Sequence, residues 1–124
     1  MAIPLIEEYF NQEIEESYEI KIGLKYTKKY KFSLGNNRLL VETKNFSWTK
    51  SDNIPSAKIS KLKEEMFHFL IAPKKYKKIL VMNNSIRISS GESLAFYFTR
   101  LYQYIIPEDV RILELINGKL VERN

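Results

Sequence analysis

Glu42 and Lys44 are the two residues whose types and spacing first suggest chemistry. They end the stretch RLLVETK, residues 38–44, in which three aliphatic residues precede the charges. Strand alternation sends residues two apart to the same face, so both groups project together from the end of a sheet. Such a pair is either a solvated ion pair worth only ~0–1 kcal/mol or the working edge of a catalytic site.

The residue types that the chain lacks limit this chemistry. It has no cysteine and a single histidine, His68. Disulfides, thiolate zinc sites and histidine-rich metal sites are therefore excluded, as is any serine or cysteine triad not built on His68. Any metal must be held by carboxylates and carbonyls.

Length and charge set the class of protein. The 124 residues, 44% of them hydrophobic, predict a single domain over 1–124. No apolar run approaches the roughly 18 residues of a membrane span, and the N-terminus turns acidic where a signal peptide would stay apolar, so we expect a cytoplasmic protein with no membrane partner. The net charge of +5 comes from basic runs interleaved with tyrosines. Such a surface is typical of proteins that bind a nucleic-acid backbone, although lysine runs are also ordinary solubilising surface.

Hydrophobic periodicity predicts the elements that must position Glu42 and Lys44. Apolar residues at helical spacing alternate along the chain with apolar residues at strand spacing, and turn residues separate them. The expected elements are a helix to about residue 16, strands at 18–26, 30–34 and 38–44, a helix at 56–71 capped by Ser56, a strand at 78–82, a helix after a Ser89–Glu92 capping box that Pro107 ends, and a strand at 110–115. Helices should therefore flank a mixed sheet.

The turn at 35–37 sets the predicted hairpin register. If Asn36 and Asn37 are its central residues, Ser33 pairs with Leu40 and shares a face with Glu42 and Lys44. Ser33 then lies diagonal to Glu42, roughly 7–8 Å away between backbones, close enough for both side chains to reach a common ion. A carboxylate would be expected at that position.

The segment KYKFSLGNNRLLVETKNFSWT resembles the PD-(D/E)xK nuclease superfamily, whose core is the restriction-endonuclease-like αβββαβ fold. In that superfamily one hairpin strand carries an acidic residue and the next carries an ExK tripeptide, followed by a helix. The chain is similar to the branch whose first strand contains Phe-Asp-Leu-Gly, and the likeness continues to about Leu115. It implies an α/β (α+β mixed) fold with a central mixed sheet flanked by helices.

The resemblance implies a Mg²⁺-dependent or Mn²⁺-dependent DNA endonuclease of restriction or repair type. Glu42 and the Thr43 backbone carbonyl would hold the metal, and Lys44 would position the attacking water and counter the charge of the transition state. Ser33 stands where the family has its metal-binding aspartate, so the site is expected to be inactive as written or completed by another acid. The candidates for that acid are Glu64 or Glu65 in the following helix, and Glu7, Glu8, Glu13 and Glu16 near the N-terminus.

Other residues are candidates for binding. Those that could contact DNA are Trp48, Lys50, Lys58 and Lys61, although a loop tryptophan more often anchors its loop to the core. His68 is expected at the surface. Four apolar residues at helical spacing should pack against the sheet or against a second subunit: Phe96, Phe98, Leu101 and Tyr104. A homodimer is therefore one of the expected alternatives. The alternative function is a catalytically degenerate domain that binds DNA without cutting or binds protein only.

Overall fold

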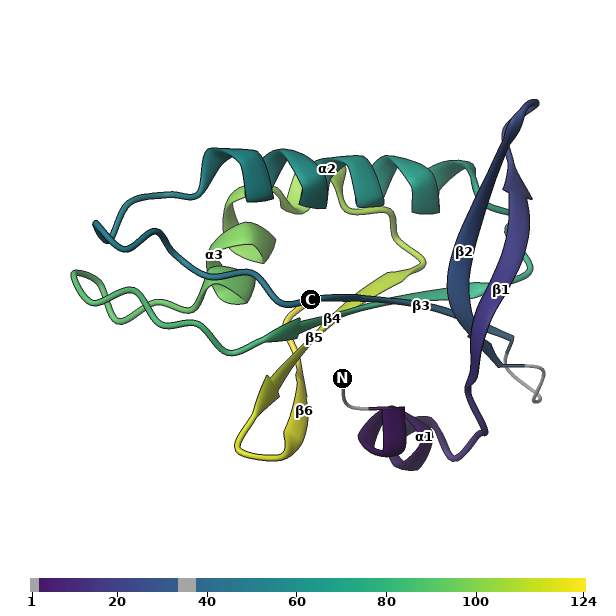
Figure 1. Ribbon diagram of the computed structural model, residues 1–124, viewed down its shortest axis with the longest axis horizontal. Helices are drawn as coiled ribbons and strands as arrows, with labels where there is room; N and C mark the ends of the chain where they lie inside the picture. The colour runs from purple at the N-terminus through teal and green to yellow at the C-terminus, as the bar shows by residue number, and fades with distance from the viewer. Residues whose placement is uncertain (1–2, 34–37) are drawn as a thin grey trace.

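The computed structural model describes residues 3–33 and 38–124. These residues form one six-stranded mixed sheet, whose strands follow one another in chain order, with helices on both faces (Figure 1). The elements are α1 (Ile3–Phe10), β1 (Glu15–Ile22), β2 (Tyr26–Ser33), β3 (Leu39–Lys44), α2 (Ser56–Ile71), β4 (Lys77–Asn83), α3 (Leu94–Leu101), the 3₁₀ turn η1 (Gln103–Ile105), β5 (Val110–Ile116) and β6 (Lys119–Glu122).

The strand directions follow from the connections between strands. β1, β2 and β3 form an antiparallel meander, whereas β3, β4 and β5 run parallel and β6 returns antiparallel to β5. Parallel neighbours need a crossover, and α2 and α3 supply the two that join β3 to β4 and β4 to β5. The predicted mixed α/β class, with helices flanking a mixed sheet, is confirmed. Within the described part of the chain, no helix combines the length and apolarity that crossing a bilayer requires.

Alternating side chains divide the core between the two faces of the sheet. On one face, Leu40 of β3 and Leu80 of β4 pack beneath the buried residues of α2 and α3. On the other face, Val41 and Ile79 pack against Ile6 of α1. The predicted apolar run of β4 is thus a central strand that is buried on both sides.

The predicted hairpin register was wrong by one residue. Ser33 pairs with Leu39, Phe32 with Leu40 and Lys31 with Val41. This register buries the large pair Phe32 and Leu40 together in the core beneath α2, and a shift of one residue would move β2's whole apolar set to the other face. The turn residues 35–37, on which the prediction depended, lie outside the described residues.

Several predicted boundaries and caps were also wrong. The first helix ends at Phe10, and residues 27–29 belong to β2 because the chain turns earlier, at Gly23, whose φ of +65° favours glycine. Ser93, and not Ser89, caps α3 by accepting from the Phe96 amide. Ser56 is the first residue of α2 and caps nothing with its side chain.

Candidate functional site

Glu42 and Lys44 both project from β3 towards α2, as strand alternation predicted. There they meet Glu65 of α2 and Lys28 of β2. The Lys28 ammonium donates to Glu65 Oε1 at 2.8 Å and lies 3.4 Å from Glu42 Oε2. Lys44 Nζ lies 3.8 Å from Glu65 Oε1. We call these four residues the Glu42–Glu65 cluster: two carboxylates from different elements, with two ammonium groups between and beside them.

The hairpin and the helix each contribute one residue that the sequence alone did not select. Periodicity left Glu64 and Glu65 equivalent, but the Glu65 side chain is 6% exposed within the cluster, and that of Glu64 is 65% exposed. Lys28 was missed because it was assigned to a turn. Strand alternation continued backwards from Phe32 and Tyr30 would have placed it on the face of β2 that covers α2.

Three buried polar atoms at this site have no hydrogen-bond partner within the described residues. They are Glu65 Oε2, the Tyr30 hydroxyl and His68 Nδ1. Such atoms are rare in folded proteins and commonly mark a place where water or an ion binds. The prediction of a surface histidine was wrong, because Tyr26 of the hairpin packs over the His68 ring with centroids 5.2 Å apart.

The two carboxylates of the cluster keep Lys28 protonated. Burial would lower the pKa of Lys28, but the hydrogen bond to Glu65 and the negative charges of Glu65 and Glu42 outweigh it, so the pKa is raised. Burial, followed by the same two carboxylates, raises the pKa of the Tyr30 phenol. Lys28 is therefore a cation and Tyr30 a neutral hydroxyl at neutral pH.

Ser33 is not part of this cluster. The corrected register places it on the α1 side of the sheet beside Leu39, fully buried, where its hydroxyl donates to Gln12 Oε1 at 2.7 Å. The residues of β2 that share the face of Glu42 are Tyr26, Lys28, Tyr30 and Phe32, and none of them is acidic. The predicted partnership of Ser33 with Glu42 is thus wrong.

The N-terminal candidates Glu7 and Glu8 belong to α1, which packs against the opposite face of the sheet.

The cluster offers a hard divalent cation only two carboxylates. Among residues 3–33 and 38–124, no group of three or more histidine, cysteine, aspartate or glutamate side chains could hold a metal. Mg²⁺, however, commonly binds proteins through one or two carboxylates and keeps several waters. Glu42 and Glu65 already share one cation, and none of the described residues forms a hydrogen bond with Glu65 Oε2. These residues therefore fit a divalent ion once Lys28 moves aside, with the Thr43 backbone adjacent to Glu42.

The residues predicted to contact DNA fall into two groups. Trp48 is buried: its indole donates to the Ser85 carbonyl at 3.1 Å and packs on Tyr97, so it anchors its loop. The three lysines are exposed, and one of them lies near the cluster. Lys58 and Lys44 place their ammonium groups 5.1 and 5.8 Å from the centroid of the same ring, that of Phe46.

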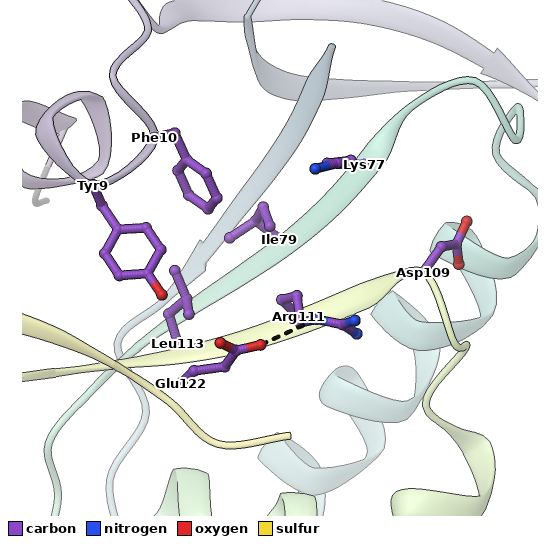
Figure 2. A pocket seen from close by; sticks show the side chains of 8 residues that line it. All are labelled: Tyr9, Phe10, Lys77, Ile79, Asp109, Arg111, Leu113 and Glu122. Atoms are coloured by element: carbon purple, nitrogen blue, oxygen red, sulfur yellow. Dashed lines mark ion pairs between the residues drawn. The ribbon is translucent and has the colours of Figure 1, made fainter. Parts of the chain in front are cut away.

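A separate pocket of about 300 Å³ lies on the other face of the sheet, beside α1 (Figure 2). Ile79 and Leu113 line it together with charged residues, three of which form ion pairs. Arg111 lies 3.0 Å from Glu122, and Asp109 lies 2.7 Å from buried Lys78. Because Ile79 lies on the opposite face from Glu42, this pocket does not open onto the cluster.

No protein-family model, curated protein or solved structure matches this chain.

Proposed function

We propose that this chain is a metal-dependent DNA endonuclease of restriction or repair type, with the Glu42–Glu65 cluster as its site. The observation that carries the proposal is that Glu42 of β3 and Glu65 of α2 converge on one cation position beside Lys44. The order α1, β1, β2, β3, α2, β4, with β3 and β4 parallel, supports a restriction-endonuclease-like αβββαβ core. In this proposal Glu65 replaces the absent first-strand aspartate of the PD-(D/E)xK superfamily.

Each residue of the cluster has a distinct role. Glu42, Glu65 and the Thr43 carbonyl would hold Mg²⁺ or Mn²⁺, which supplies Lewis-acid activation of water and phosphate when bound. Lys44 is a flexible point charge close to Glu65, so it can orient the attacking water and counter the charge that develops on the phosphate oxygens.

Exposed lysines would bring DNA to this site. The cluster itself contains two positive and two negative charges, so it attracts phosphate weakly. Lys58, at the first turn of α2, contacts the same Phe46 ring as Lys44 does, which places it beside the cluster. Lys50 and Lys61 are exposed in the preceding loop and on the same helix. We propose that these lysines hold the backbone of double-stranded DNA.

A second function is favoured by one specific observation. The Lys28 ammonium lies 2.8 Å from a Glu65 oxygen and 3.4 Å from a Glu42 oxygen, and Lys44 lies beside Glu65. The two lysines balance the two negative charges without a metal, which favours a degenerate relative that binds DNA without cutting it.

Plasmid cleavage with Mg²⁺ or Mn²⁺ tests the first function against the second. We expect slow nicking by the unmodified chain, loss of nicking in Glu65→Gln and unchanged nicking in the matched control Glu64→Gln, because only Glu65 faces Glu42. DNA binding should persist in both variants. Salt-sensitive DNA binding without metal-dependent nicking in any variant would instead establish the degenerate function.

A further inference from the structure

Lys28 holds the position at which a divalent cation would be expected. Its ammonium contacts carboxylate oxygens from two different elements, Glu65 Oε1 at 2.8 Å and Glu42 Oε2 at 3.4 Å. Of these two carboxylates, Lys44 forms an ion pair with Glu65 alone, at 3.8 Å. Lys28 is thus the cation common to both carboxylates. We propose that Lys28 is a tethered cation that competes with the divalent metal, so that metal binds only in exchange for it.

The charges of the cluster explain why a cation must occupy this position. Two partly buried carboxylates facing each other repel, and removing one partner of a buried ion pair leaves the other charge uncompensated. Lys28 supplies one positive charge there and Mg²⁺ would supply two. Either cation can therefore stabilise the fold, but the two cannot occupy the same position between Glu42 and Glu65.

The surroundings of Lys28 allow the exchange. Its side chain is 13% exposed, so it already reaches solvent from the edge of the cluster. Four flexible methylene groups let a lysine ammonium swing away without a change in the backbone. The carboxylates that it would leave keep Lys44 nearby, and Glu65 Oε2 has a free lone pair for the incoming ion.

This inference rests on the proposed function for the identity of the metal site, but it predicts a property that needs no cleavage. Metal affinity should be weak in the unmodified chain, because only molecules with Lys28 displaced can bind. Replacing the ammonium by an uncharged group of similar length should therefore strengthen metal binding. It should also make the stability of the fold depend on metal.

Lys28→Met is the test variant, and Lys29→Met is its matched control. Lys29 is the next residue in β2, but its side chain is 66% exposed and only approaches Glu19, at 3.8 Å. Calorimetric titration with MgCl₂ and MnCl₂ should give about tenfold or more tighter binding for Lys28→Met than for the unmodified chain. Its Tm without metal should fall and should rise again with MnCl₂. Lys29→Met should behave as the unmodified chain does.

Further variants keep the test decisive. If Lys28→Met does not fold without metal, Lys28→Gln retains a hydrogen-bonding group without the charge and should show the same gain in affinity. The double variant Lys28→Met with Glu65→Gln should fold and lose the response to metal. A folded Lys28→Met or Lys28→Gln whose metal affinity and metal-dependent Tm equal those of the unmodified chain would overturn the proposal.

The outcomes also separate this inference from the proposed function. If Lys28→Met binds metal tightly but no variant cuts DNA, the proposal that Lys28 is a tethered cation is supported and the endonuclease proposal is rejected. If the unmodified chain cuts DNA with Mg²⁺ and Lys28→Met gains no affinity for metal, the endonuclease proposal is supported and the proposal that Lys28 is a tethered cation is rejected.

Discussion

At the scale of single residues, one position along a helix decides whether a carboxylate joins the Glu42–Glu65 cluster. Glu64 and Glu65 are neighbours in α2, but successive helical residues point about 100° apart. Glu65 therefore enters the face formed by Leu62, Met66 and Phe69, and Glu64 points to solvent. A charge on that face is tolerated because Lys28 and Lys44 meet it there.

Ser33→Asp tests the corrected register at this scale. The new carboxylate would enter a fully buried position facing α1, beside Leu39, and not the Glu42–Glu65 cluster. We expect the free energy of unfolding, measured in urea, to fall by about 2–4 kcal/mol, because a carboxylate loses its hydration in this buried position. Cleavage should not increase.

Ser33→Ala is the control for that substitution. It removes the hydrogen bond to Gln12 without adding charge, so it should cost only about 1 kcal/mol. If Ser33→Asp were as stable as the unmodified chain and cut DNA faster, Ser33 would have to face Glu42 after all.

At the scale of elements, the β1–β2 hairpin completes the site. It rises past the C-terminal end of α2 (Figure 1), where Tyr30 stacks on Phe69 with ring centroids 5.4 Å apart. That contact fixes the face of β2 that carries Lys28. The position of the Lys28 ammonium in the cluster thus depends on packing between β2 and α2, which are distant in the sequence.

The second hairpin, β5–β6, depends on its two-residue turn. Asn117 and Gly118 have φ of 50° and 74°, the left-handed values of a type I′ turn. Gly118→Ala should lower the free energy of unfolding by about 1 kcal/mol, because a Cβ strains this backbone even though no neighbouring atom obstructs it.

Gly118→Asn is the matched comparison for this turn. Asparagine tolerates a positive φ better than alanine does, so its loss of stability in urea should be smaller. Equal stability of the alanine variant and the unmodified chain would show that the turn is not held in this conformation.

Element types and their order were predictable from periodicity, but their registers and turns were only partly so. β4, α2 and β5 have strong apolar patterns, and the structure places them where they were predicted. The turn residues 27–29 were misjudged because lysines and a threonine suit a turn and an edge strand equally well. β6 was missed although Asn117-Gly118 between two apolar runs is a strong hairpin signal. Glu65 was one of two predicted acids, and strand alternation could have indicated the face of Lys28, but the contact between them was beyond prediction because it joins β2 to α2, which no local pattern encodes.

At the scale of the whole molecule, the net charge of +5 lies outside the balanced cluster. In the proposed function, attraction to DNA therefore comes from exposed lysines, and those near the cluster would set the orientation of the duplex. Lys58 and Lys61 lie on α2, whereas Lys119 lies on β6, which contacts α1.

DNA affinity should fall steeply with salt. If three phosphates are contacted, the association constant of a short duplex should fall roughly 40-fold between about 50 and 200 mM salt. Replacing both Lys58 and Lys61 by alanine should reduce the slope of log K against log salt by about 2, and Lys119→Ala should leave it unchanged. Fluorescence anisotropy measures both. Equal slopes for all three proteins would place the DNA on another surface.

The central claim is that Glu42 and Glu65 together hold the metal at which a DNA phosphate binds. Anomalous diffraction from crystals of this chain grown with a short DNA duplex and Mn²⁺ tests it most directly. The account predicts one Mn²⁺ peak between the Glu42 and Glu65 carboxylates, a phosphate oxygen in contact with it, and the Lys28 ammonium displaced from both. A Lys28 ammonium still bonded to Glu65 and Glu42, with no Mn²⁺ peak between them, would contradict it.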